Sequence, residues 1–158
     1  MSYERAKEHL EKFGLADRIK LFDVSSATVA LAAEALGCEP KRIAKSIALA
    51  DGDNAIIVVA AGDAKIDNHK FKETFSMKAK MLSFDDTERL TGHAVGGVCP
   101  FGVPENVKIY LDDSLKRFDI VYPAAGTSNS AVKLTLDELY KASGAQKYVD
   151  VCKIPEGE

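Results

Sequence analysis

The chain has 158 residues, of which 46% are hydrophobic and 28% charged, and its formal net charge at pH 7 is −3. This composition is typical of one globular domain with a sizeable core, so we expect a single domain over residues 1–158 and exclude a disordered chain. The acidic balance is not typical of a nucleic-acid-binding protein, because such domains usually carry a basic excess, and no DNA partner is expected.

Helices are predicted in the first part of the chain. The segment after Ser2 has apolar residues at helical spacing and stops at Gly14, which suits a left-handed cap. Thr28 can cap a second helix that ends at Gly37. Pro40 then favours the first turn of a short helix through KRIAK.

A β-hairpin follows. The apolar runs SIALA (46–50) and AIIVVAA (55–61) are separated by the polar turn DGDN. Beyond it, Asp67 can begin a helix through HKFKETF, and AKML (79–82) is interpreted as a strand.

In the second half of the chain, predicted helix caps alternate with predicted strands. Ser83 with Asp86 can cap a helix that ends near Gly92, and Thr135 with Glu138 is a capping-box pair. Strands are predicted at VKIYL, DIVYPAA, SAVKL and KYVDVC. Since strands outnumber helices and often follow one another without a crossover helix, we expect an α+β fold. Its sheet should be curved and mixed or largely antiparallel, with helices packed outside it.

No membrane span or disulfide framework is expected. No apolar run approaches the roughly 20 residues of a membrane-spanning helix, and the N-terminal segment is charged throughout. Cys38, Cys99 and Cys152 are widely spaced without a CxxC motif, which indicates reduced thiols. We therefore predict a cytoplasmic protein without membrane contact.

The segment LTGHAVGGVCPFGVP (90–104) places four glycines and two prolines around Cys99. Such backbone can approach a ligand closely and present its N–H groups to a carbonyl or an oxyanion. A tight corner between strands is the structural alternative. A second alternative is a cysteine hydrolase with Cys99 as nucleophile and His93 as base, although a cysteine in an apolar stretch is more often a buried filler.

We expect neither a metal nor a cofactor. DGDN is similar to the start of a calcium loop, but the glycine and the distant glutamate of that motif are misplaced. His9, His69 and His93 lack the paired spacing of zinc ligands.

Two groups of lysines are candidates for binding anions. Lys45 lies where KRIAK meets the apolar run SIALA, and an ammonium beside an apolar wall can position an ester or a phosphate. Lys65, Lys70 and Lys72 belong to the lysine-rich segment 64–80, which is either a solvated helix face or a local surface for phosphates.

Four segments together resemble a known family. They are TVALAAEALGCEPKRIAKSIAL, GDAKIDNHKF, TGHAVGGVCPFG and YPAAGTSNSAVKLTLDEL, and in this order they are similar to the YbaK and prolyl-tRNA-synthetase-associated editing domains over roughly residues 25–145. The resemblance implies a barrel-like curved sheet with surrounding helices. It also implies an enzyme that hydrolyses the ester bond of mischarged aminoacyl-tRNA.

The resemblance also implies a site. Its signature lysine matches Lys45, and its GxxxP loop matches Gly96–Pro100, where a small residue such as Ser is common at the position of Cys99. A nucleophilic thiol is therefore not implied. The predicted catalytic residues are Lys45, Gly96 and Gly97. The predicted substrate-binding residues are Thr28, Val98, Cys99, Pro100, Phe101, Gly102, Gly126 and Thr127, with Lys65, Lys70 and Lys72 as tRNA phosphate contacts.

The implied partner is the acceptor end of an aminoacyl-tRNA, tRNA-Pro or a related tRNA carrying a small amino acid. At 158 residues the chain is too short for synthetase catalytic and anticodon domains, so we expect a freestanding trans-editing protein. Prolyl-tRNA synthetase or an elongation factor can supply tRNA selectivity, and a monomer or weak dimer is expected. A non-catalytic tRNA-binding module on the same fold is a further alternative.

Overall fold

The computed structural model describes residues 2–22 and 28–154. Its α-helices are α1 (Ser2–Glu11), α2 (Val29–Leu36), α3 (Asn68–Phe75), α4 (Phe84–Thr91) and α5 (Leu136–Ser143). Its strands are β1 (Ile19–Leu21), β2 (Ile43–Asp51), β3 (Asn54–Ala61), β4 (Lys65–Ile66), β5 (Lys108–Asp112), β6 (Ile120–Pro123), β7 (Ser130–Val132), β8 (Leu134–Thr135), β9 (Tyr148–Val149) and β10 (Cys152–Lys153). Across this part of the chain, every helix is too short or too polar to cross a membrane.

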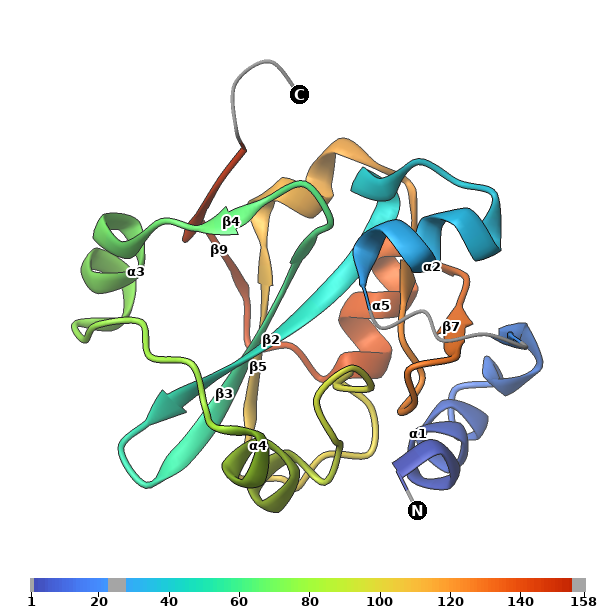
Figure 1. Cartoon of the computed structure of the whole chain (residues 1–158), viewed down its shortest axis with the longest axis horizontal. Coiled ribbons are helices and arrows are strands. Elements are labelled where there is room, and N and C mark those ends of the chain that lie inside the picture. The colour runs from blue at the N-terminus through green and yellow to red at the C-terminus, as the bar shows by residue number, and fades with distance from the viewer. Residues whose placement is uncertain (1, 23–27, 155–158) are drawn as a thin grey trace.

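A mixed six-stranded sheet forms the centre of the fold. Its strand order is β8-β6-β2-β3-β5-β9, in which β2–β3 and β6–β8 are antiparallel and the other three pairs are parallel. Two small antiparallel sheets, β1–β7 and β4–β10, flank it. Figure 1 shows the β2–β3 hairpin crossing the middle of the molecule, with α3 on one side and α1 and α2 on the other. The predicted α+β fold with a mixed sheet is confirmed.

The hairpin was predicted correctly because its turn and its apolar run are both unambiguous. Asp51 pairs with Asn54, and Gly52 between them has a φ of 61°, which glycine adopts without strain. All side chains from Ala55 to Ala61 are at most 2% exposed, since β3 lies centrally in the sheet and is covered on both faces. This explains the continuous apolar run in place of an alternating one.

Each of the helix caps predicted after residue 27 is present. The side chains of Thr28, Asp67, Ser83 and Thr135 accept hydrogen bonds from the first turns of α2, α3, α4 and α5. The Thr135–Glu138 capping box is complete, with both reciprocal bonds at 2.9 and 3.1 Å. Each such cap contributes about 1 kcal/mol, so the local sequence fixes where these helices begin.

Four element predictions were wrong in whole or in part. SAVKL and KYVDVC each contain two short strands of different sheets, β7 and β8 in the first and β9 and β10 in the second. Only Pro40–Arg42 is helical, as a 3₁₀ turn, because Ile43 and Ala44 already pair with β6. AKML forms a single bridge, Leu49 to Met81, in place of a strand. The consequence is that Lys45 lies inside β2 rather than at a junction between a helix and a strand.

Candidate active site

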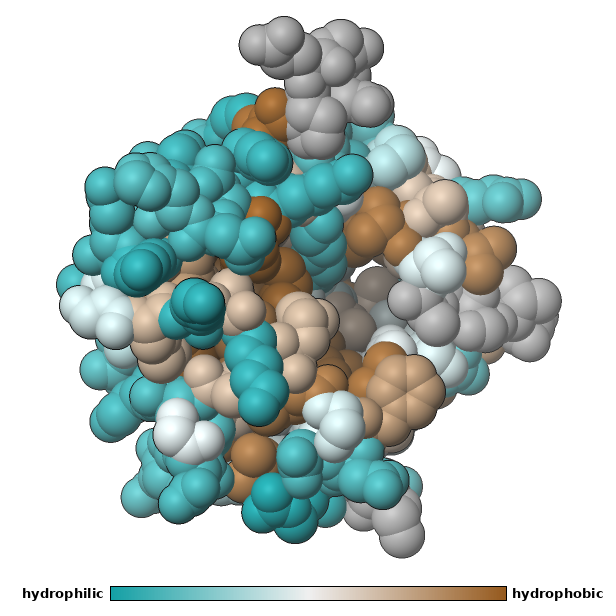
Figure 2. All heavy atoms as spheres, turned by 60° about the vertical axis from the view of Figure 1, so that its left-hand side comes forward, coloured by the Kyte–Doolittle hydropathy of each residue, from teal (hydrophilic) through white to brown (hydrophobic). Residues whose placement is uncertain are grey.

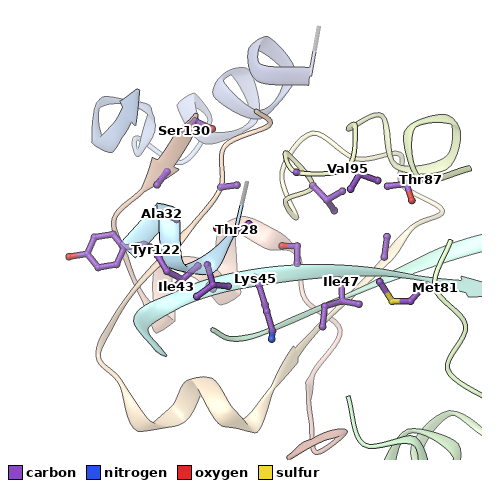
Figure 3. A pocket seen from close by; sticks show the side chains of 18 of the residues that line it. Thr28, Ala32, Ile43, Lys45, Ile47, Met81, Thr87, Val95, Tyr122 and Ser130 are labelled. Carbon is purple, nitrogen blue, oxygen red and sulfur yellow. The ribbon is translucent and has the colours of Figure 1, made fainter. Parts of the chain in front are cut away.

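A cavity of about 280 Å³ opens beside the first half of β2. Its walls come from the start of α2, from residues 81–87, from the loop that follows α4 and from the β6–β7 region (Figure 3). Most of the lining is apolar, and the polar side chains are Thr28, Lys45, Ser46, Thr87 and Ser130. A cavity of this size holds a small ligand or the end of a larger one.

The glycine-rich loop reaches the cavity through a tight turn. The Gly97 amide donates to the Ala94 carbonyl at 2.9 Å, and Gly96 has a φ of 98°, which is the requirement at the third position of a type II turn. Gly96 and Val98 line the cavity. Among the described residues, no acceptor engages the amides of Gly96 and Val98. These two amides, rather than that of Gly97, are therefore available to a ligand.

Gly97 holds two loops together. A Cβ atom at this position would lie 2.7 Å from the Gly126 carbonyl oxygen and 2.9 Å from Thr127 Cα, closer than side chains approach. The loop that contains Gly126 and Thr127 is held in place by Ser130. The Ser130 hydroxyl accepts a hydrogen bond from Ala125 N at 3.0 Å and donates one to Thr127 O at 3.1 Å. Gly97, Gly126 and Thr127 thus set the position of Gly96 without lining the cavity themselves.

The remaining predicted residues of the loop lie behind it. Cys99 and Phe101 are fully buried, and Pro100 is also buried. The Gly102 amide donates to His9 Nδ1 of α1 at 3.0 Å. None of these four loop residues lines the cavity, because the turn at Ala94–Gly97 brings the chain back into the core. This differs from the expectation that they contact substrate, and it makes them supports of the loop.

The geometry argues against a Cys99–His93 pair. Burial raises the pKa of the Cys99 thiol to about 12. His93 Nε2 lies 2.7 Å from the Phe101 carbonyl and must donate to it, so Nε2 cannot accept a proton from the thiol 3.6 Å away. Burial lowers the pKa of His93, and its other nitrogen, Nδ1, is buried without a partner among the described residues. The thiol therefore stays protonated, whereas a nucleophilic cysteine must be a thiolate.

Lys45 is one of the residues that line the cavity, and its ammonium is bound to carbonyls that do not line it. Nζ donates to the carbonyl of Ala64 and, at 3.5 Å, to that of Gly62. Figure 3 shows Lys45 and Ile47 on the opposite side of β2 from Thr28 and Val95. Burial lowers the pKa of Lys45, the charges of Cys152 and Asp63 partly oppose this, and the nearby Lys65 has a smaller lowering effect. Within the described residues the hydrogen-bond partners of this half-buried ammonium are neutral carbonyls, which leave its positive charge unbalanced.

The three lysines predicted to contact phosphate differ in their surroundings. Lys70 Nζ is bound to Asp150 Oδ1 and to the Cys152 carbonyl, each at 3.0 Å, and the hydrogen bond to Asp150 raises its pKa. It is therefore engaged in fixing α3 to the last strand. Lys65 and Lys72 are exposed, and Lys65 is close enough to Lys45 to affect its pKa.

The sequence of this chain matches a family model and is similar to those of known proteins. The family model named aminoacyl-tRNA editing domain matches residues 24–142. The chain belongs to this editing-domain family. A relative in Bacillus subtilis, the uncharacterized protein YwhH, is 47% identical over 154 residues, which cover 97% of the chain and 98% of YwhH.

Three further similar proteins carry functional descriptions. EbsC of Enterococcus faecalis, a candidate Cys-tRNA(Pro)/Cys-tRNA(Cys) deacylase, is 26% identical over 72% of the chain and 71% of its own length. The crystal structure of a candidate trans-editing enzyme for prolyl-tRNA synthetase superimposes with a TM-score of 0.86 at 28% identity, covering 96% of the chain and 97% of that structure. The proline–tRNA ligase of Streptococcus suis is 25% identical over 76% of the chain, which spans only 19% of the ligase.

Several cavity residues of this editing domain were missed from sequence. Ser46, Thr87 and Ser130 are its unpredicted polar groups, and Ser46 Oγ is buried with no hydrogen-bond partner in the described part of the chain. Ser46 carried a weak signal, as a hydroxyl at the start of an otherwise apolar strand. Within residues 2–22 and 28–154, no group of three His, Cys, Asp or Glu side chains is placed to hold a metal ion.

Proposed function

We propose that this protein hydrolyses the ester bond of tRNA mischarged with a small amino acid, acting as a freestanding trans-editing enzyme. The observation that carries the proposal is the small apolar cavity, with the Gly96 turn and Lys45 in its walls. Membership of the editing-domain family supports ester hydrolysis. The names of EbsC and of the structural relative support tRNA-Pro, or a related tRNA, as the carrier.

The chemistry follows from what the loop can supply. The ester carbonyl lies against the amides of Gly96 and Val98, and water, aligned by the neighbouring ribose hydroxyl, attacks the carbonyl carbon and gives up its proton to the departing ribose oxygen. The two amides stabilise the oxyanion that forms, as fixed backbone donors do in other acyl transfers. The bond from the carbonyl carbon to the ribose oxygen then breaks. With water as the nucleophile, the products are the free amino acid and a tRNA with its terminal hydroxyl restored.

Lys45 has a role in positioning the substrate in this scheme. Its ammonium leaves the carbonyls of Ala64 and Gly62 for the terminal phosphodiester or the polarised aminoacyl group of the substrate. Partial burial strengthens that contact, because less water competes for the charge. Lys65 and Lys72, which are exposed, contact phosphates farther from the ester.

Size selects the amino acid. The cavity walls include Ala32, Ile43 and Val98, and the amino acid shares the cavity of about 280 Å³ with the ester end of the tRNA, which favours a small side chain. One methylene in such a pocket is worth about 1–3 kcal/mol. Alanine, serine, cysteine and threonine are all compatible with this site. We propose that the whole chain forms this editing domain, works in the cytoplasm as a monomer or weak dimer, and obtains tRNA selectivity from prolyl-tRNA synthetase or an elongation factor.

Incubation with a panel of mischarged tRNAs tests the proposal. Alanyl, seryl, cysteinyl and threonyl esters of tRNA-Pro, together with the same amino acids on their own tRNAs, are expected to include at least one substrate. Release of labelled amino acid is followed against an enzyme-free reaction, with prolyl-tRNA-Pro as the correctly charged control. Binding of these tRNAs without turnover would identify a non-catalytic module and contradict the proposal.

Replacement of Cys99 by alanine is expected to leave kcat/KM for deacylation within about threefold of the wild type, because the buried thiol has no part in the reaction. Stability should fall by about 1 kcal/mol, since the substitution leaves a small cavity in the core. Deacylation kinetics and urea unfolding measure the two effects. Loss of activity in a folded Cys99→Ala protein would restore the thiol mechanism.

A further inference from the structure

Exposed apolar side chains gather at the mouth of the cavity. Phe84 is 77% exposed, Met81 64% and Val95 48%, and all three line it. Figure 2 shows hydrophobic residues in and around a hollow of the surface, with hydrophilic residues beyond them. Large exposed apolar side chains that cluster at a cavity usually mark a contact surface.

The position of Phe84 in α4 does not explain why it is a phenylalanine. It is the first residue of the helix, where Ser83 already provides the cap, and an aromatic residue has no advantage over others at that position. Burial of a phenylalanine normally stabilises a fold, and that stabilisation is forfeited here. A ligand that covers the ring would account for its exposure.

The charges beside Phe84 restrict what this ligand can be. Asp85 and Asp86 follow it in the first turn of α4, so their carboxylates already occupy the end of the helix that would attract a phosphate. Figure 3 shows Met81, Thr87 and Val95 together toward one end of the cavity, with Tyr122 and Ala32 toward the other. The end of the cavity at Met81 therefore suits a neutral, flat group. The phosphates of the ligand are expected near Lys45, Lys65 and Lys72 instead.

We propose that Phe84, with Met81 at the same rim, is a stacking platform for the terminal nucleobase of the aminoacyl-tRNA. This inference rests on the proposed function, in which the ester lies inside the cavity, because the base is joined to the same ribose as the ester. Stacking on an aromatic ring tolerates any base sequence, since every base has a π-face. The platform therefore holds the end of a tRNA without reading the rest of it.

The test uses a non-hydrolysable probe, the 3′-deoxy-3′-alanylamino derivative of 2-aminopurine riboside. Its fluorescence is expected to be quenched when it binds the wild-type protein, as the base stacks. Phe84→Ala and Phe84→Leu should weaken binding by about 10- to 100-fold. Phe84→Tyr should bind as the wild type does. Leu21→Ala is the matched control, because Leu21 is 55% exposed on β1 and lies outside the cavity lining.

The variants separate the possible outcomes. Wild-type binding and quenching in Phe84→Leu would show a general apolar contact and overturn the stacking proposal. Unchanged probe binding in Phe84→Ala, together with weakened association with a synthetase, would identify the rim as a protein interface and overturn it too. Deacylation by the wild type is measured in parallel. An active wild type with unaffected Phe84 variants refutes only this inference, whereas an inactive wild type refutes the proposed function.

Discussion

Replacement of Lys45 by methionine is expected to lower kcat/KM for deacylation by about 100-fold or more. Methionine keeps an aliphatic stem of similar length along the cavity wall but removes the ammonium that would hold the substrate's charged or polarised group. The size of the loss is that seen when one preorganised electrostatic contact to a reacting group is removed. Single-turnover and steady-state kinetics on the best substrate of the tRNA panel measure it.

The matched control is Lys141→Met, which removes an exposed ammonium from α5, outside the cavity lining and the proposed phosphate contacts, and should change kcat/KM less than about threefold. Folding is checked by thermal unfolding. Desolvation of the Lys45 ammonium opposes folding, so the Lys45→Met variant should lose little or no stability relative to the wild type. If Lys45→Met were as active as Lys141→Met, the assignment of Lys45 would be wrong.

The pH profile gives an independent signature of the same group. Burial lowers the pKa of Lys45 in the folded protein below that of an ordinary lysine. Activity that depends on the ammonium should therefore fall, as pH rises, at a lower pH than an exposed lysine would dictate. The charged form is disfavoured in the folded state, so this group's contribution to stability increases as pH rises through the lowered pKa. Both effects should be absent from Lys45→Met, after correction for spontaneous ester hydrolysis.

Local chemistry made the helices and the central hairpin predictable. Thr28, Ser83 and Thr135 cap helices through their own backbone neighbours, and this requires no knowledge of the rest of the fold. The same reasoning was wrong for KRIAK, because pairing of Ile43 and Ala44 with β6 decides that segment. Such a contact joins residues about 80 positions apart and leaves no local pattern.

In the candidate site, too, some features could be predicted from the sequence and others depend on tertiary contacts. The family resemblance marked Lys45 and the Gly96 turn, and both line the cavity. It could not separate Gly96, whose amide is free of acceptors among the described residues, from Gly97, whose amide is bound to Ala94. It also could not show that Cys99 turns inward, since only the packing of the loop on the core decides which side chains face the cavity.

Replacement of Gly97 by alanine is expected to lower kcat/KM by about 100-fold and the free energy of unfolding by about 1–3 kcal/mol. The added Cβ would lie 2.7 Å from the Gly126 carbonyl oxygen, so one of the two loops must move. The clash involves backbone on both sides, and no flexible side chain can relieve it. Displacement of the Ala94–Gly97 turn would carry the Gly96 and Val98 amides away from the ester carbonyl.

Gly52→Ala is the control for this prediction. Gly52 has a φ of 61°, and apart from Gly52 and its two chain neighbours no atom of the described residues lies within 4 Å of the place that a Cβ would take, so alanine there strains the hairpin turn without a clash. It should lower stability by about 1–2 kcal/mol and leave the activity of the folded protein unchanged. Comparing the two variants separates loss of stability from loss of loop geometry. Equal activity in folded Gly97→Ala and Gly52→Ala would mean that the position of the Gly96 turn does not matter for catalysis, and the oxyanion role of its amides would then have to be abandoned.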